Sequence, residues 1–155
     1  MSERPILLVA SSGGHLLQLL TLREAYTGLP TIWVANDRSD ARSLLASERA
    51  HFLPGPFSRH ARSLLSNAVF AFRLIRRERP AAVLTTGADV AVAFAWIGRL
   101  FGARVIYVES FTRIETVSLS CKLIKPVAHE IYVQWPELLE LLPGARFAGA
   151  VAVVE

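Results

Sequence analysis

The chain has 155 residues, of which 52% are hydrophobic and 19% are charged, and its formal net charge at pH 7 is +4. This length allows one domain with a hydrophobic core, and the composition excludes a disordered or low-complexity chain. We therefore expect one domain over residues 1–155. A single cysteine, Cys121, cannot form an internal disulfide, and the four histidines are scattered. We expect no metal and no cofactor.

Short apolar runs rich in β-branched residues alternate with longer helical patterns along the chain. The expected strands cover residues 6–10, 31–35, 51–53, 82–85, 104–108, 130–133 and 146–148. The expected helices cover residues 15–26, 40–48, 61–78, 90–101, 121–125 and 136–142. This alternation predicts an α/β fold, a Rossmann-like parallel sheet with helices on both faces.

None of these segments is predicted to cross a membrane. The longest apolar stretch without a charge or a proline, Val90 to Gly98, is far shorter than the roughly 20 residues that span a bilayer. The run Ile6 to Ala10 is too brief for the core of a secretory signal. The sequence therefore predicts a cytosolic protein, or one held to the cytosolic face of a membrane.

Ligands of open parallel sheets bind beyond the carboxyl ends of the strands. The residues that follow the expected strands are polar and glycine-rich in an otherwise apolar chain. They are Ser11 to His15, Asn36-Asp37, Thr85 to Asp89, Glu109 to Arg113 and Gln134-Trp135. We expect the functional site among them.

The turn Ser11-Ser12-Gly13-Gly14 before His15 is the strongest local signal. Two glycines let the backbone approach a ligand closely, and the helix start that follows favours a phosphate. Dinucleotide binding and P-loop ATP hydrolysis are disfavoured, because the third glycine of the first motif and the Gly-Lys-Ser/Thr of the second are missing. A tight turn whose serines cap the helix stays open as the alternative.

His15 and Glu109 are the candidate general bases. The positive end of a helix favours a neutral imidazole at His15, and an apolar strand end would partly desolvate the Glu109 carboxylate. The alternative for His15 is a histidine bonded to a backbone carbonyl. The alternative for Glu109 is a carboxylate that pairs with Arg113 or caps the next segment. Trp135 either stacks on a sugar or belongs to the core.

Thr86, Gly87 and Asp89 follow the fourth expected strand. Thr86-Gly87 is a candidate backbone donor to a phosphate or a sugar. Asp89 is more economically explained as the N-cap of the next helix than as a ligand contact.

The expected helix 61–78 has a cationic side. On a helical wheel, Phe70 and Leu74 fall at the edge of the side that carries Arg62, Arg73 and Arg77. The expected inward side is formed by Leu64, Leu65, Ala68, Val69, Ala71, Phe72 and Ile75. We expect the cationic side and its edge to contact an anionic membrane surface, through Arg62, Phe70, Arg73, Leu74 and Arg77. A solvated face is the alternative, and nucleic acid is disfavoured because stacking platforms and a binding motif are missing.

A set of short motifs spread in order over nearly the whole chain resembles one family. They are Ser11-Ser12-Gly13-Gly14-His15-Leu16 with Gln18-Leu19, Thr85-Thr86-Gly87-Ala88-Asp89, Tyr107-Val108-Glu109-Ser110, Tyr132-Val133-Gln134-Trp135-Pro136 and Gly149. The set resembles the asparagine-linked-glycosylation fourteen (Alg14-like) family, including bacterial members in capsule and exopolysaccharide synthesis.

The resemblance implies the amino-terminal, acceptor-binding half of a GT-B glycosyltransferase, made as a separate chain. It implies a partner, an Alg13-like donor-domain subunit that binds the nucleotide-sugar, and an acceptor, a polyprenyl-diphosphate-linked saccharide. His15 and Glu109 would be catalytic. The acceptor-binding residues would be Ser11, Ser12, Gly13, Gly14, Thr86, Gly87, Asp89 and Ser110.

Eukaryotic relatives carry an amino-terminal membrane anchor, whereas this sequence begins at its first strand. We therefore expect a bacterial, peripheral protein at the cytoplasmic face of the cell membrane. The competing hypothesis is a Rossmann-like regulatory module that binds a nucleotide or a protein without catalysis.

Overall fold

The computed structural model describes residues 4–54 and 61–151, and of residues 61–63 the backbone only. The described strands are β1 (Ile6–Ala10), β2 (Thr31–Asn36), β3 (Ala50–Leu53), β4 (Ala82–Gly87), β5 (Arg104–Val108), β6 (Glu130–Val133) and β7 (Arg146–Phe147). The α-helices are α1 (Gly14–Thr21), α2 (Ser39–Leu44), α3 (Ala61–Glu78), α4 (Asp89–Leu100) and α5 (Leu119–Ile124). Two 3-10 helices, η1 (Arg23–Tyr26) and η2 (Pro136–Leu139), complete the order.

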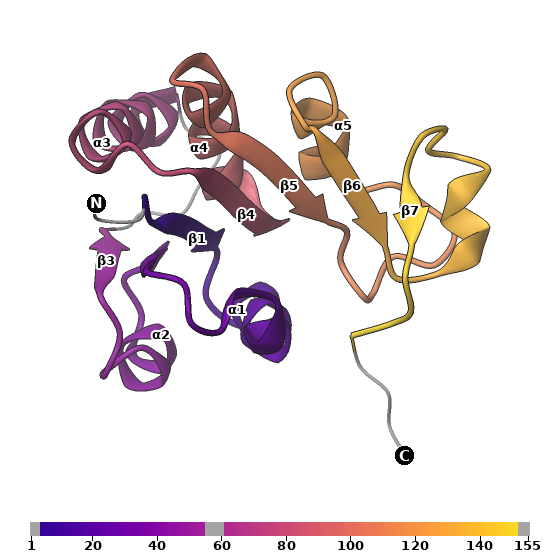
Figure 1. Ribbon diagram of the computed structural model, residues 1–155, viewed down its shortest axis with the longest axis horizontal. Helices are drawn as coiled ribbons and strands as arrows, with labels where there is room; N and C mark the ends of the chain where they lie inside the picture. Colours follow the sequence, from indigo (N-terminus) through magenta and orange to yellow (C-terminus); the bar gives the residue numbers. More distant parts are fainter. Residues whose placement is uncertain (1–3, 55–60, 152–155) are drawn as a thin grey trace.

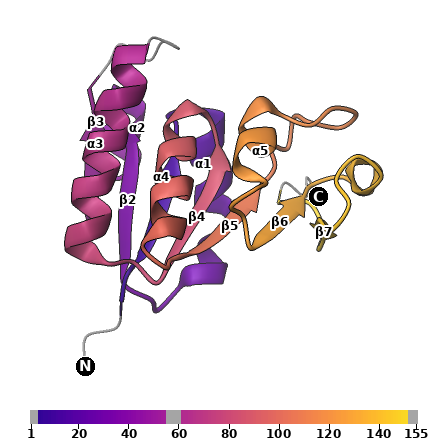
Figure 2. The same ribbon diagram turned by 90° about the horizontal axis from the view of Figure 1, so that it is seen from above.

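The described strands form one parallel sheet in the order β3-β2-β1-β4-β5-β6-β7. Helices α3, α4 and α5 cover one face, and α1 and α2 cover part of the other (Figure 1). Seen from above, α3, α4 and α5 lie next to one another over the sheet (Figure 2). The order reverses between β1 and β4, so the loops after these strands diverge and leave a crevice at their carboxyl ends. The predicted Rossmann-like α/β fold is confirmed.

The central strands are apolar on both faces because helices pack on both sides. Along β1, Leu7 and Val9 belong to the cluster beneath α3 and α4, whereas Leu8 and Ala10 pack toward α1 and α2. All four side chains are fully buried. Burying one leucine stabilises the fold by about 1.5–3 kcal/mol, so these strands form a rigid platform for the loops at their ends.

Three expected helices are shorter in the structure. The helix expected over 15–26 ends at Thr21, and a 3-10 turn follows, in which the Tyr26 hydroxyl donates to the carbonyl of Leu19 at 2.9 Å. The helix expected over 40–48 ends at Leu44, and the one expected over 136–142 is the 3-10 helix Pro136–Leu139. Periodic apolar spacing does not distinguish a helix from successive tight turns that bury the same side chains.

Candidate functional site

His15 lies in the first turn of α1, directly after the glycine turn. Its Nδ1 is 2.8 Å from the carbonyl oxygen of Thr86, and because a carbonyl only accepts, this nitrogen carries the proton and donates. The Thr86 hydroxyl donates back to the carbonyl of His15 at 2.7 Å. The pair fixes the imidazole tautomer, so in the neutral ring the lone pair is on Nε2, where a general base needs it. The alternative of a histidine bonded to a backbone carbonyl is therefore observed, and because this bond leaves Nε2 available, the role of His15 as a general base stays a prediction.

His15 lines two hollows at the carboxyl edge of the sheet. The first, which we call the β2 hollow, has a volume of about 290 Å³ and is formed by the loops after β1, β2 and β4. Its lining residues are Ser11, Ser12, His15, Asn36, Arg38, Ala88 and Asp89. Three of the expected acceptor-binding residues, Ser11, Ser12 and Asp89, thus meet the candidate base in one place.

The second, which we call the α1 hollow, lies between α1 and the loop after β5 and has a volume of about 440 Å³. Its lining residues are Gly14, His15, Leu17, Gln18, Thr21, Ser110, Phe111, Thr112 and Val151. No carboxylate stands among these described lining residues. The structure therefore brings Gly14, His15 and Ser110 together as expected, beside apolar side chains.

The glycine turn before α1 is hydrogen-bonded to a carboxylate of α2, that of Asp40. Gly13 has φ 84°, which favours glycine, and its N–H donates to Oδ2 of Asp40 at 3.0 Å. Within the described chain, no side chain caps α1, so the alternative of a serine-capped turn does not hold. The first amides of α1 thus lack side-chain partners, and an anion there would compete with Asp40.

Asp89 is not the N-cap that we expected. The N-cap of α4 is Ala88, at φ 74°, and Asp89 is the first helical residue. The Asp89 carboxylate accepts from the N–H of Val90 at 2.8 Å through one oxygen, while the residue lines the β2 hollow. Ligand contact by Asp89 stays a prediction.

Thr86 and Gly87 support the site from beneath. Neither is among the described residues that line the two hollows, and both are buried. A Cβ at Gly87 would lie 2.8 Å from the Tyr107 hydroxyl, so only glycine fits there without displacement. Contact of these two residues with a phosphate or a sugar stays a prediction; in the structure Thr86 orients His15.

Glu109 is a buried brace and not an accessible base. It is 0% exposed, and its carboxylate accepts from the N–H groups of Ser110 (2.8 Å) and Ser118 (3.0 Å) and from the Tyr107 hydroxyl (3.1 Å). The expected role as a proton acceptor from substrate is therefore wrong, because its oxygens are occupied and covered. Burial, together with the Glu109 charge, raises the pKa of Cys121 to about 12 and that of Tyr107 far above its usual value.

Gln18 and Phe111 are site residues that the sequence interpretation did not single out. The buried Gln18 carboxamide donates to the carbonyl of Glu109 at 2.8 Å and accepts from the N–H of Phe111 at 3.1 Å, which joins α1 to the loop. Trp135 donates to the carbonyl of Phe111 at 2.7 Å and packs against its ring. Trp135 therefore supports Phe111 and is not among the lining residues described for the two hollows. The signal for Gln18 was its place in the quoted motif.

The inward face of α3 differs from the expected one. Leu74 is 4% exposed and belongs to the core, and the half-buried Phe70 packs edge-on against Phe94 of α4. Leu74 as a membrane contact is therefore wrong, and Phe70 is largely inward. Arg73 and Arg77 are exposed as expected, whereas the Arg62 side chain lies outside the described residues.

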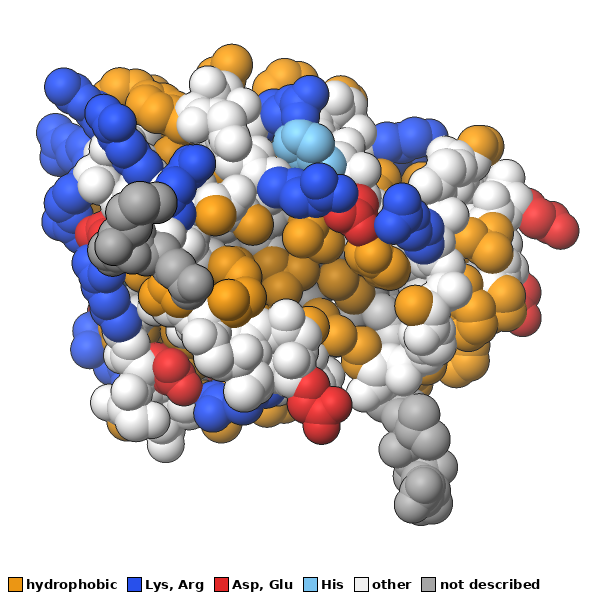
Figure 3. Space-filling model, in the orientation of Figure 1, with side chains coloured by type: hydrophobic (Ala, Val, Ile, Leu, Met, Phe, Trp, Pro, Cys, Tyr) orange, Lys and Arg blue, Asp and Glu red, His pale blue; other side chains and the backbone are white. Residues whose placement is uncertain are grey.

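Several apolar side chains expected in the core are exposed instead. Leu65, Val69 and Phe72 on α3 are 67%, 42% and 45% exposed. They continue across Phe101, which contacts the Phe72 ring, onto α4 and α5. We call this surface the α3–α4–α5 face; its apolar members are Leu65, Val69, Phe72, Trp96, Leu100, Phe101, Leu119 and Leu123. In Figure 3 basic and apolar side chains lie together along the edge formed by α3.

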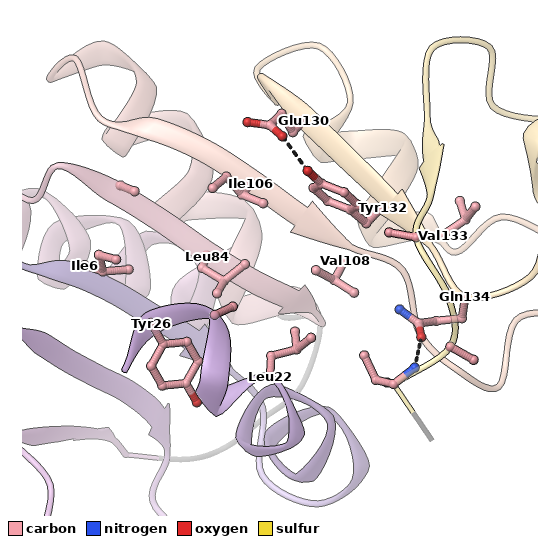
Figure 4. A pocket seen from close by; sticks show the side chains of 16 residues that line it. Ile6, Leu22, Tyr26, Leu84, Ile106, Val108, Glu130, Tyr132, Val133 and Gln134 are labelled. Atoms are coloured by element: carbon pink, nitrogen blue, oxygen red, sulfur yellow. Dashed lines mark hydrogen bonds between the residues drawn. The ribbon is translucent and has the colours of Figure 1, made fainter. Parts of the chain in front are cut away.

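An apolar groove of about 410 Å³ opens on the opposite face of the sheet. Strand side chains including Leu84, Ile106, Val108 and Tyr132 line it, with Leu22 and Tyr26 on its other side (Figure 4). We call it the sheet groove. No described helix covers this part of β5 and β6 on the side where α1 lies (Figure 1).

The residues that the structure describes form neither a metal-binding cluster nor a membrane-spanning helix. No three His, Cys, Asp or Glu side chains there group closely enough to hold a metal ion. None of the described helices is both long and apolar enough to cross a membrane.

Sequence and structure comparisons place the chain among known proteins. The family model "Oligosaccharide biosynthesis protein Alg14 like" matches residues 34–151. The mouse protein named UDP-N-acetylglucosamine transferase subunit ALG14 is 28% identical over 178 residues, with 94% of this chain and 82% of the mouse protein covered. The protein of the same name from Eremothecium gossypii is 30% identical, with 96% and 80% covered.

Among solved structures, MurG from Acinetobacter baumannii superposes with a TM-score of 0.77 at 17% identity, over 98% of this chain and 47% of MurG. UDP-N-acetylglucosamine 2-epimerase from Rickettsia bellii superposes with a TM-score of 0.74 at 15% identity, over 96% of this chain and 45% of the epimerase. The chain therefore spans about half the length of these structures, and at this identity the likeness is one of fold, that of one half of a GT-B protein. On the family match and the curated relatives, the chain belongs to the Alg14 family of glycosyltransferase-related subunits.

Proposed function

We propose that this chain is the acceptor-binding, membrane-recruiting subunit of a two-component glycosyltransferase. The complex transfers a sugar from a nucleotide-diphosphate-sugar to a polyprenyl-diphosphate-linked saccharide, in bacterial capsule or exopolysaccharide synthesis at the cytoplasmic face of the cell membrane. The observation that carries the proposal is His15, whose tautomer is fixed by Thr86 and which lines both hollows at the crevice. The relatives named as subunits of a UDP-N-acetylglucosamine transferase support the reaction class.

The α1 hollow suits a prenyl diphosphate. The amide end of α1 and the hydroxyls of Ser110 and Thr112 offer donors to phosphate oxygens, and no described lining residue is acidic. Leu17 and Phe111 offer apolar contact to the first isoprene units. The α1 hollow thus offers hydrogen-bond donors for the diphosphate next to apolar side chains for the lipid.

His15 supplies the base. Its Nε2 accepts the proton of the acceptor hydroxyl while the hydroxyl oxygen bonds to the anomeric carbon of the donor sugar. The bond from that carbon to the nucleotide diphosphate breaks, and the diphosphate leaves with the electron pair. Thr86 holds the imidazolium through Nδ1, and the proton then passes to solvent.

The sheet groove suits an apolar helix of the donor subunit. Parallel sheets are normally covered on both faces, and here strand side chains such as Ile106 and Tyr132 line an open groove. The chain also matches only about half of the GT-B-type structures that it resembles in fold. A partner's helix would complete this layer.

The α3–α4–α5 face suits an anionic membrane surface. The three helices together carry six basic residues and two acidic ones, Glu78 and Asp89, which stand at helix ends. Exposed Phe72 and Trp96 offer side chains that insert at a lipid interface, while arginines meet lipid phosphates. The proposed membrane contacts therefore include Arg73 and Arg77, with the exposed Phe72 and Trp96 as apolar contacts in place of the buried Leu74.

The test is reconstitution with an Alg13-like donor-domain chain. We expect transfer from UDP-N-acetylglucosamine to a prenyl-diphosphate-linked sugar by the mixture and negligible transfer by either chain alone. His15→Ala should lower kcat of the mixture by about 10²- to 10⁴-fold while the two chains still co-purify. Full turnover by the His15→Ala complex would show that His15 is not the base. Robust turnover by the lone chain would refute the two-component proposal.

A further inference from the structure

The β2 hollow contains a buried polar group that neither the His15 base nor the proposed diphosphate position explains. Asn36, the last residue of β2, lines this hollow and is 5% exposed. Its Oδ1 has no hydrogen-bond partner among the residues that the structure describes. An unpaired buried acceptor is costly, and native proteins pair most such groups. The missing partner therefore points to a group from outside the chain.

Other polar groups of the hollow indicate the charge of that partner. Asp89 has one carboxylate oxygen bonded to the N–H of Val90, and Ser11 and Ser12 bring hydroxyls that donate and accept. Arg38 lines the same hollow, so its wall contains one charge of each sign. A hollow with balanced charge and several hydroxyl and amide groups suits a neutral polyol better than a second phosphate.

We infer that the β2 hollow is the saccharide subsite of the acceptor and that the Asn36 carboxamide binds a hydroxyl or amide N–H of that sugar. The inference rests on the proposed acceptor function of this site. It divides the acceptor between the two hollows, with the diphosphate in the α1 hollow and the sugar in the β2 hollow. His15 lines both, so the base stands beside the sugar that carries the reacting hydroxyl. Because Oδ1 is covered by the wall, the carboxamide must turn about χ2, a torsion with broad preferences, to meet the sugar.

The experiment compares two probes on the full-length chain by calorimetry. One is farnesyl diphosphate linked to N-acetylglucosamine. The other is the methyl ester of farnesyl diphosphate, which has the same charge and lipid but no sugar. We expect the sugar-linked probe to bind about three- to tenfold more tightly, the range for one neutral hydrogen bond.

Asn36→Ala should reduce this ratio of affinities to about one. Asn67→Ala changes a half-buried asparagine on α3 that does not line the hollow, and it should leave the ratio unchanged. A ratio kept by Asn36→Ala, or no sugar preference in the parent chain, would overturn the inference. Failure of the methyl ester alone to bind would count against the diphosphate position, and failure of both probes would remove the diphosphate position and the sugar subsite together.

Thermal unfolding separates binding from folding. Because Oδ1 of Asn36 has no described partner, Asn36→Ala should change Tm by less than about 2 °C. A fall of more than about 5 °C would show that Asn36 holds the fold through a bond of its own, and it would overturn the inference. Asn36→Asp keeps an acceptor oxygen and should retain part of the sugar preference.

Discussion

Glu109→Gln tests the assignment of Glu109 as a buried brace. In the parent chain the carboxylate accepts from the N–H groups of Ser110 and Ser118 and from the Tyr107 hydroxyl. Glutamine has nearly the same volume but one acceptor oxygen, so one backbone N–H faces an amide NH2 and loses its acceptor. The loss of a charge-assisted bond and the unpaired donor together lower the free energy of unfolding by about 2–4 kcal/mol.

Equilibrium unfolding in urea, followed by tryptophan fluorescence, measures this change directly. For a chain of this size the expected fall in Tm is about 4–16 °C. Glu115→Gln, an exposed residue of the same loop, is the matched control and should change the free energy by less than about 0.5 kcal/mol. A Glu109→Gln chain with parental stability and no sugar transfer in the complex would refute the reasoning, because a catalytic base behaves in that way.

Three further predictions concern the anion position, pH and the membrane. Asp40→Ala frees the N–H of Gly13 and removes a negative charge, so calorimetry should show about two- to fivefold tighter binding of the methyl farnesyl diphosphate; weaker binding would contradict this position. Burial, and after it the neighbouring arginines, lowers the pKa of His51 in the folded chain. The unfolded chain therefore binds more protons, and the free energy of unfolding should fall as the pH drops below about 6.5. In urea titrations of His51→Gln the free energy of unfolding should depend less steeply on pH, and an unchanged dependence would exclude His51 as the cause. Phe72→Asp should reduce flotation with anionic liposomes, whereas Leu44→Asp on α2, on the other side of the sheet, should not; equal losses would count against the α3–α4–α5 face.

The sheet and the glycine turn could be predicted because local pattern determines them. Strands buried on both faces are continuous apolar runs, and the boundaries expected for Ile6–Ala10, Arg104–Val108 and Glu130–Val133 are those observed. Parallel strands also place their carboxyl ends at one edge, which brings His15 near the loops after β2, β4 and β5.

The inward face of α3 could not be predicted from the helix alone. The helix is strongly amphipathic, yet part of its apolar side, including Leu65 and Phe72, is exposed. Neighbouring side chains decide which side is buried: Phe94 on α4 and His51 on β3 both pack against the Phe70 ring. This choice turns Phe70 and Leu74 inward and leaves Phe72 at the surface. The exposed apolar surface is therefore a consequence of packing that only the assembled fold reveals.

Glu109 and Asn36 show why polar roles at the carboxyl edge need the tertiary structure. Asn36 ends one buried strand and Glu109 directly follows another, each is at least nine-tenths buried, and sequence reasoning gives both a place near the site. The fold provides Glu109 with three donors, whereas the described residues provide Oδ1 of Asn36 with none. An unpaired buried acceptor lowers the stability of the protein without ligand, whereas a paired one does not. Glu109 therefore stabilises the fold without any bound molecule. No described residue supplies the missing bond of Asn36, which makes Asn36 the better candidate for recognising the acceptor.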